Sequence, residues 1–151
     1  MCRITALRVE TLSLHIRRSL VCQSVSQLYH VWFSTKGRKA ALQGEIGSDV
    51  ERLIADAASA AGIRVLELAL VFDHCHMLIA LSEGQSLAAV MHRLKGASSR
   101  CIRLKYPDLK LDMAYGSFWQ KGYGFRPVPE DQTPRVRHYI RTQLNRPVRR
   151  Q

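Results

Sequence analysis

The apolar residues of this chain follow two periods, one typical of helices and one typical of strands, and both recur along its length. Residues 27–35 are rich in Val, Trp, Phe and Tyr, whereas apolar positions between Val50 and Ala61 fall three or four apart. In chain order the first half therefore predicts a strand over 27–35, a basic turn over 36–39, a helix over 50–61 ended by Gly62, and strands over 63–72 and 74–81.

The second half predicts a helix, a strand over 118–125 with glycine punctuation, and a last helix. The first of these helices has an apolar stripe made of Leu87, Val90, Met91, Leu94 and Cys101. Thr133 can cap the last helix, Pro134 suits its first turn, and Pro147 ends it. The order β-α-β-β-α-β followed by a helix predicts an α+β protein with a ferredoxin-like antiparallel sheet, helices on one face and the other face open.

Two histidines stand one residue apart in the apolar, strand-forming segment 70–79. Side chains alternate along a strand, so His74 and His76 are expected to converge from one face. Four residues are then expected on the opposite face, packed on helices: Cys75, Met77, Ile79 and Leu81. Burying two imidazoles without partners costs free energy, so the pair indicates a shared metal ion; rings satisfied by carbonyls or water are the alternative.

The last helix carries a second candidate group. Tyr139 and Gln143 are four residues apart and therefore neighbours on one helical face, so a phenol and an amide oxygen can meet the same ion or substrate. A phenol is a weak nucleophile near neutral pH, and a divalent cation that polarises a phosphate would help it attack phosphorus. The alternative is a tyrosine at the margin of the core with its hydroxyl in water.

Together these segments resemble the single-tyrosine HUH transposases of small bacterial insertion sequences and the related transposases associated with repetitive extragenic palindromes. HUH denotes His, a bulky apolar residue and His. The matching motifs occur in the right order between residues 24 and 143, at 29–36, at 73–79, at 94–100, and at Tyr139 with Gln143. The chain departs from the family pattern at Cys75, where a branched aliphatic residue is more usual, and in residues 1–23, which lack the resemblance.

The resemblance implies a single HUH transposase domain over 24–151, preceded by an extension over 1–23. It implies that His74, His76 and Gln143 hold Mg²⁺ or Mn²⁺ while Tyr139 attacks single-stranded DNA, forming a 5′-phosphotyrosine intermediate that is later rejoined. Relatives recognise DNA hairpins at element ends. In the insertion-sequence branch the tyrosine helix of one subunit serves the histidines of the other, so the resemblance implies a homodimer with shared active sites here. The palindrome-associated branch can act as monomers.

Composition favours a polyanionic partner. The 151 residues include 23 Lys and Arg against 12 Asp and Glu, giving a formal charge of +11, which predicts salt-sensitive binding of nucleic acid. Candidate contacts are Lys36, Arg38, Arg93, Lys95, Ser99, Arg100, Arg103, Lys121, Arg135 and Arg141. Trp119, Tyr123 and Phe125 are candidates for base stacking, with core packing the alternative for Trp119 and close helix approach the alternative for Ser99.

Other classes of protein fit less well. The four cysteines show no paired spacing, so reduced thiols are expected. No apolar stretch is long enough to span a bilayer, and arginines interrupt the start of the chain, so no membrane partner and a cytoplasmic location are expected. Two alternatives stay open: a catalytically idle single-strand-binding protein of the same fold, and a zinc site made by His74, His76 and Cys75, although Cys75 should point the other way.

Overall fold

The computed structural model describes residues 27–109 and 117–143 of the chain. Its strands are β1 (Gln27–Ser34), β2 (Arg64–Leu70), β3 (His74–Leu81) and β4 (Gly124–Pro127). Its helices are α1 (Gly44–Ala60), α2 (Leu87–Lys105) and α4 (Thr133–Gln143), with short 3-10 turns η1 (Lys36–Arg38) and η2 (Glu130–Gln132). Residues 1–23 and Pro147, on which the sequence predictions also depended, lie outside the described residues.

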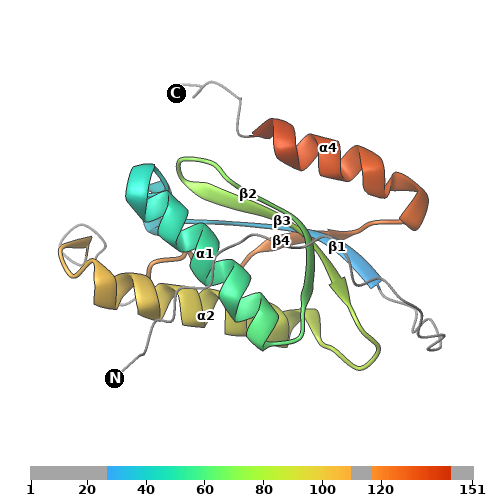
Figure 1. Cartoon of the computed structure of the whole chain (residues 1–151), viewed down its shortest axis with the longest axis horizontal. Coiled ribbons are helices and arrows are strands. Elements are labelled where there is room, and N and C mark those ends of the chain that lie inside the picture. Colours follow the sequence, from blue (N-terminus) through green and yellow to red (C-terminus); the bar gives the residue numbers. More distant parts are fainter. Residues whose placement is uncertain (1–26, 110–116, 144–151) are drawn as a thin grey trace, which may run out of the picture.

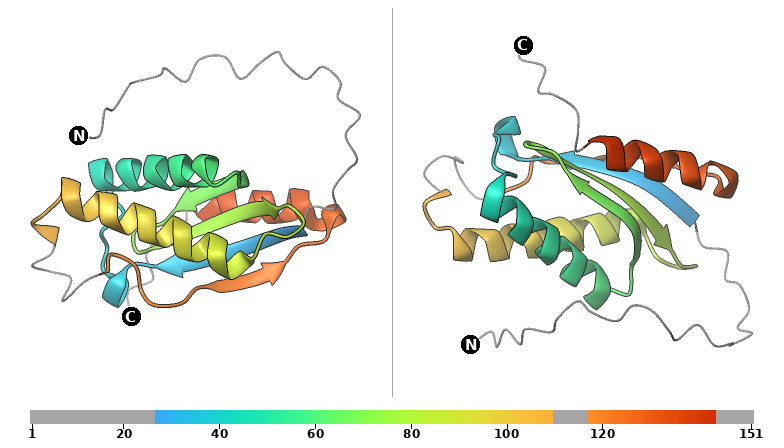
Figure 2. Two further views of the ribbon diagram at one scale, coloured as in Figure 1. Left: turned by 90° about the horizontal axis from the view of Figure 1, so that it is seen from below. Right: turned by 45° about the horizontal axis from the view of Figure 1, so that its top comes forward.

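The four strands form one antiparallel sheet in the order β2-β3-β1-β4, which confirms the ferredoxin-like prediction. Helices α1 and α2 cover one face, and α4 lies on the other, as two different views show (Figures 1 and 2). The face predicted to be open is therefore partly covered by α4. Within the part of the chain described, no helix combines the length and apolar character needed to cross a membrane.

Side chains of strand β3 pack on both faces of the sheet. Cys75, Met77, Ile79 and Leu81 are all buried in the core that α1 and α2 cover, as their alternation predicted. Leu78, between them, belongs to a second apolar cluster on the α4 side. The central strand is thus fixed by packing on both sides, and the histidines at its start share that rigidity.

Two parts of the second half were predicted wrongly. Residues 118–125 are not one strand, because Phe118 and Trp119 are buried in the core at 1% exposure and the chain turns at Gly122, where φ is 82°, before β4 begins. The Trp119 indole donates a hydrogen bond to Ser98 Oγ at 2.9 Å, so its role is core packing. The apolar stripe of α2 was predicted to end at Cys101, but Cys101 is exposed. Ile102 is buried in its place, so the stripe ends one position later than expected.

Helix α4 docks on the sheet through apolar and ionic contacts. Val136 and Ile140 are buried against the apolar side chains of β2 and β3. Flanking them, Arg137 and Arg141 approach the Glu67 carboxylate of β2 at 3.1 and 3.0 Å. Burial by itself would raise the pKa of Glu67, but the hydrogen bonds from both arginines outweigh it and the pKa is lowered. These contacts fix the position of the helix that carries Tyr139.

Replacing Glu67 with Gln removes the charge that both arginines share. We expect the free energy of unfolding at neutral pH to fall by up to about 1 kcal/mol, since the arginine side chains are partly exposed and water screens the pairs. Thermal melts of Glu67→Gln, with Glu51→Gln on the exposed side of α1 as control, measure it. Because the pKa of Glu67 is lowered in the folded state, this stabilisation is lost as the pH falls through that value, and the two proteins converge. If Glu67→Gln and the wild type melt at the same temperature at neutral pH, apolar contacts alone hold α4.

Candidate active site

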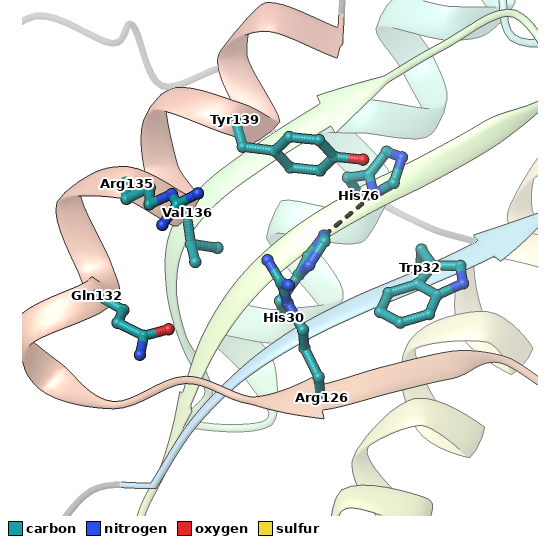
Figure 3. Close-up of a pocket in the computed structure, with 8 residues that line it drawn as sticks. All are labelled: His30, Trp32, His76, Arg126, Gln132, Arg135, Val136 and Tyr139. Atoms are coloured by element: carbon teal, nitrogen blue, oxygen red, sulfur yellow. Dashed lines mark hydrogen bonds between the residues drawn. The ribbon is translucent and has the colours of Figure 1, made fainter.

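A cavity of about 570 Å³ lies where α4 faces the sheet. Side chains from three strands and from the α4 region surround it, and Figure 3 shows them pointing toward one another. They are His30 and Trp32 of β1, His76 of β3, Arg126 of β4, and Gln132, Arg135, Val136 and Tyr139. Among these side chains are imidazoles, a phenol and guanidinium groups. An imidazole can transfer protons, a phenol can act as a nucleophile, and a guanidinium can bind a phosphate.

The two predicted histidines lie together at the start of β3. The ring centroids of His74 and His76 are 4.9 Å apart with the rings nearly perpendicular. His74 Nδ1 lies 2.5 Å from Asp73 Oδ1, and the Arg38 guanidinium bonds the other oxygen of that carboxylate at 3.0 Å. Asp73 therefore orients His74 and is itself held in place by the Arg38 guanidinium.

His30 of β1 joins this pair, although sequence reasoning did not select it. Its Nε2 lies 3.1 Å from His76 Nδ1, and its ring is only 4% exposed. Burial, assisted by the nearby charge of Arg126, lowers the pKa of His30 from 6.5 to about 4, so the ring is neutral at physiological pH. Alternation along the first strand places His30 on the same face as Trp32, but this alone does not indicate a site residue. Only the register of β1 against β3 shows that His30 meets His76.

Tyr139 closes the cavity from α4. Its ring centroid lies 5.8 Å from that of His30 and 6.0 Å from that of His76, edge-on to both (Figure 3). These are contacts within one chain. The predicted nucleophile and one of the two predicted histidines, His76, thus share one cavity, as the family resemblance implied.

Gln143 lies one helical turn beyond Tyr139. Its side chain is buried at 5% exposure, and its amide nitrogen donates to the Tyr139 carbonyl at 3.2 Å, which orients the amide oxygen. Two imidazoles and an amide oxygen are donors that Mg²⁺ and Mn²⁺ accept, so the residues present fit such an ion. In residues 27–109 and 117–143 no three His, Cys, Asp or Glu side chains form a metal-binding group, and Cys75 is fully buried on the helix side, away from the histidines.

Some of the predicted basic residues lie on or near this face. Arg135 and Arg126 both line the cavity. Arg38 and Arg141 are engaged by Asp73 and Glu67, yet 68% and 60% of their side chains remain exposed. Lys36 lies in η1 and Lys121 is exposed in the segment before β4.

The α2 residues do not reach this cavity, because α2 covers the opposite face of the sheet (Figure 2). Arg93 and Arg100 are exposed there, and Arg103 is half-buried. Lys95 donates to the carbonyls of Gln120 and Gly122, and burial lowers the pKa of its amine. Ser99 is buried, and its hydroxyl accepts a hydrogen bond from the Phe118 amide at 3.0 Å, which gives it an internal partner instead of a surface to offer a phosphate.

Trp32 supplies an aromatic surface inside the cavity. It opposes Gly124 in the β1–β4 register and is 36% exposed. A Cβ at Gly124 would lie 2.2 Å from Cε2 of the indole, so only glycine lets the ring lie across β4. The predicted stacking residue Phe125 opposes Val31, a residue of the helix-side core, and thus lies on the other face from Trp32.

The chain is similar in sequence to known transposases. Residues 23–143 match the model of the family described as Transposase IS200 like. The chain is 30% identical over 115 residues to the ISDra2 transposase TnpA of Deinococcus radiodurans, covering 76% of this chain and 82% of that protein. It is 32% identical over 116 residues to the transposase for insertion sequence element IS200 of Salmonella typhimurium, covering 77% of this chain and 76% of that protein.

Solved structures show the same fold. A crystal structure of a protein from Deinococcus radiodurans R1 assigned as a transposase has a TM-score of 0.65 and 25% identity, covering 86% of this chain and 98% of that one. A REP-associated tyrosine transposase bound to a REP hairpin has a TM-score of 0.59, covering 86% of this chain and 72% of that one. Its identity is 11%, so this second likeness concerns the fold alone.

Replacing Gly124 with Ala should push the Trp32 ring out of the cavity, because the new methyl group would overlap the indole. Of the two tryptophans, Trp119 is 1% exposed, so acrylamide quenching of the fluorescence reports mainly Trp32. We expect stronger quenching and a red shift in Gly124→Ala, and neither in the control Gly96→Ala, where the methyl group meets open space on α2. Unchanged spectra in Gly124→Ala would mean that β4 moves instead of the ring.

Proposed function

This chain belongs to the IS200-like transposase family, and we propose that it cleaves and rejoins single-stranded DNA through a 5′-phosphotyrosine intermediate on Tyr139. The observation that carries the proposal is the position of Tyr139, whose ring edge meets His30 and His76 inside a cavity that also contains two arginines. The alternative was a tyrosine at the margin of the core with its hydroxyl in water. Such a tyrosine does not require histidines and arginines around its ring.

In the proposed step Tyr139 is the nucleophile. Its phenol loses a proton, the bond from its oxygen to phosphorus forms, and the bond from phosphorus to the 3′ oxygen breaks. The 3′ oxygen takes up a proton and leaves as a hydroxyl, while the 5′ phosphate stays on the protein. Rejoining is the reverse attack by a 3′-hydroxyl, so the strand is resealed with no water and no nucleotide hydrolysis.

His74, His76 and Gln143 are the residues that would hold Mg²⁺ or Mn²⁺. Such an ion, when bound, polarises the scissile phosphate as a Lewis acid. The two histidines are held rigidly because they begin strand β3. Asp73 also orients His74, whose Nδ1 lies 2.5 Å from Asp73 Oδ1. Arg126 and Arg135 add positive charge around the cavity for the phosphates on either side.

The substrate we propose is a single strand flanked by a DNA hairpin. A base can stack on Trp32 only if it is not already stacked and paired in a duplex, which favours unpaired DNA at the cavity. Two observations support the choice of DNA: the formal charge of +11, and the fold of a REP-associated tyrosine transposase bound to a REP hairpin.

Incubation with labelled hairpin DNA and Mn²⁺ should yield a protein–DNA band on a denaturing gel. Tyr139→Phe should give no band because the attacking oxygen is missing, and His76→Ala and excess EDTA should abolish the band through the metal site. Tyr123, a predicted stacking residue, packs against the core on the helix side instead; Tyr123→Phe removes only its hydroxyl and is the matched control, which should keep the band. DNA binding that survives EDTA without any covalent band would instead identify an idle single-strand-binding protein.

We further propose that the active protein is a homodimer with shared active sites. In the structure α4 docks on the sheet of its own chain, through Ile140 and through the two arginines on Glu67. Only the segment from Val128 to Gln132 connects β4 to α4, so exchange of α4 between two chains would make the same contacts in trans.

Mixing His76→Ala protein with Tyr139→Phe protein tests the exchange, because each variant is inactive alone. In a trans arrangement half of the random dimers contain one intact site, and about a quarter of the wild-type cleavage should return. Co-purification of the two variants on different tags shows whether subunits have exchanged. If they have and the mixture stays inactive, Tyr139 acts on the histidines of its own chain.

A further inference from the structure

We propose that His30 is a positioning residue for the metal site: it accepts a hydrogen bond from Nδ1 of His76 and thereby keeps Nε2 of His76 unprotonated, as a ligand for a divalent cation. The inference rests on the metal site of the proposed function. It assigns to the first strand a role in that site that neither the HUH pair nor the tyrosine helix supplies.

The neighbouring histidine shows the principle. The buried carboxylate of Asp73 accepts a hydrogen bond from Arg38 through one oxygen and offers the other oxygen to His74 as an acceptor. His74 Nδ1, 2.5 Å from that carboxylate, must therefore carry the proton. A neutral imidazole has one proton, so Nε2 of His74 is left with its lone pair, which is the form that binds a metal.

His76 uses the same ring atom in the same way. Its Nδ1 lies 3.1 Å from His30 Nε2, and Figure 3 shows its other ring nitrogen directed away from His30. If His30 donated this hydrogen bond, the proton of His76 would sit on Nε2 and block a cation there. Only donation from His76 to His30 gives both histidines of the pair the same tautomer, with Nε2 of each available as a ligand.

The surroundings of His30 suit an acceptor. The ring is 4% exposed and lies opposite Arg126 in the β1–β4 register, so a second positive charge at this point is disfavoured and one ring nitrogen keeps a lone pair. When Nε2 accepts from His76, the proton of His30 sits on Nδ1. That nitrogen is buried and has no hydrogen-bond partner in the part of the chain that the structure describes.

This orphaned nitrogen argues against a purely structural histidine. A buried polar atom without a partner costs about 1–3 kcal/mol, and an apolar side chain of similar size would avoid that cost. A histidine that serves only to fill the cavity wall would therefore be replaceable by Leu without loss. Its hydrogen bond to His76 is what an apolar residue cannot reproduce.

The two roles predict opposite results for His30→Leu. For a positioning residue the affinity for Mn²⁺, measured by electron paramagnetic resonance of the free ion without DNA, should fall about 10- to 100-fold. The melting temperature of the metal-free protein should stay equal or rise, since the orphaned nitrogen is gone. His30→Gln, whose amide oxygen can take the place of Nε2, should restore most of the affinity, whereas the shorter His30→Asn should not. His92→Leu, on the exposed surface of α2, is the matched control.

Each result has one meaning. Wild-type affinity in His30→Leu, or equal affinities of the Gln and Asn variants, would overturn the role of His30 while leaving the metal site intact. Absence of Mn²⁺ binding in the wild type, or binding unaffected by His76→Ala, would instead overturn the metal site of the proposed function. If His30→Leu does not fold, the comparison of the Gln and Asn variants decides. Nitrogen NMR of the Mg²⁺-loaded wild type gives a second readout: a proton on Nδ1 of His76 supports the assignment, and one on Nε2 contradicts it.

Discussion

The docking of α4 on the sheet is the contact on which the site depends. The histidines belong to β1 and β3 and would line a bare sheet surface without it, because α1 and α2 cover only the other face. Val136 and Ile140 bury the helix against the sheet, and Glu67 binds the arginines beside them. Tyr139 lies on the same helical face, between these anchors, so the packing that stabilises α4 also sets the distance from the phenol to the imidazoles.

The rigidity of the site comes from the division of β3 into two faces. Cys75 and Met77 are fully buried under α1 and α2, while His74 and His76, the residues that alternate with them, turn toward α4. A shift of the strand by one residue would exchange the two sets and destroy core and site together. The core on the helix side of the sheet therefore holds the two histidines in register at the start of β3.

The sequence predicted those parts of the site that depend on one period within one element. Strand alternation predicts the pairing of His74 with His76, and helical spacing places Gln143 one turn from Tyr139. It did not predict His30 or Trp32 as site residues, because their contacts depend on the register between strands, which a single sequence does not reveal. The prediction of a strand over 118–125 was wrong for a similar reason. The aromatic content of this segment is typical of a strand, but Phe118 and Trp119 fill a space beside α2 that exists only in the assembled fold.

If Tyr139 is the nucleophile, its phenol becomes linked to DNA, and peptide mapping identifies the linked residue. Trypsin cleaves after Arg137 and Arg141, which isolates Tyr139 from the other four tyrosines in a peptide of residues 138–141. After incubation with single-stranded hairpin DNA and Mn²⁺, mass spectrometry should find the mass of a 5′-phosphorylated nucleotide remnant on that peptide. A remnant on a peptide with any other tyrosine, or no linked peptide where DNA has been cut, would show that Tyr139 is not the nucleophile.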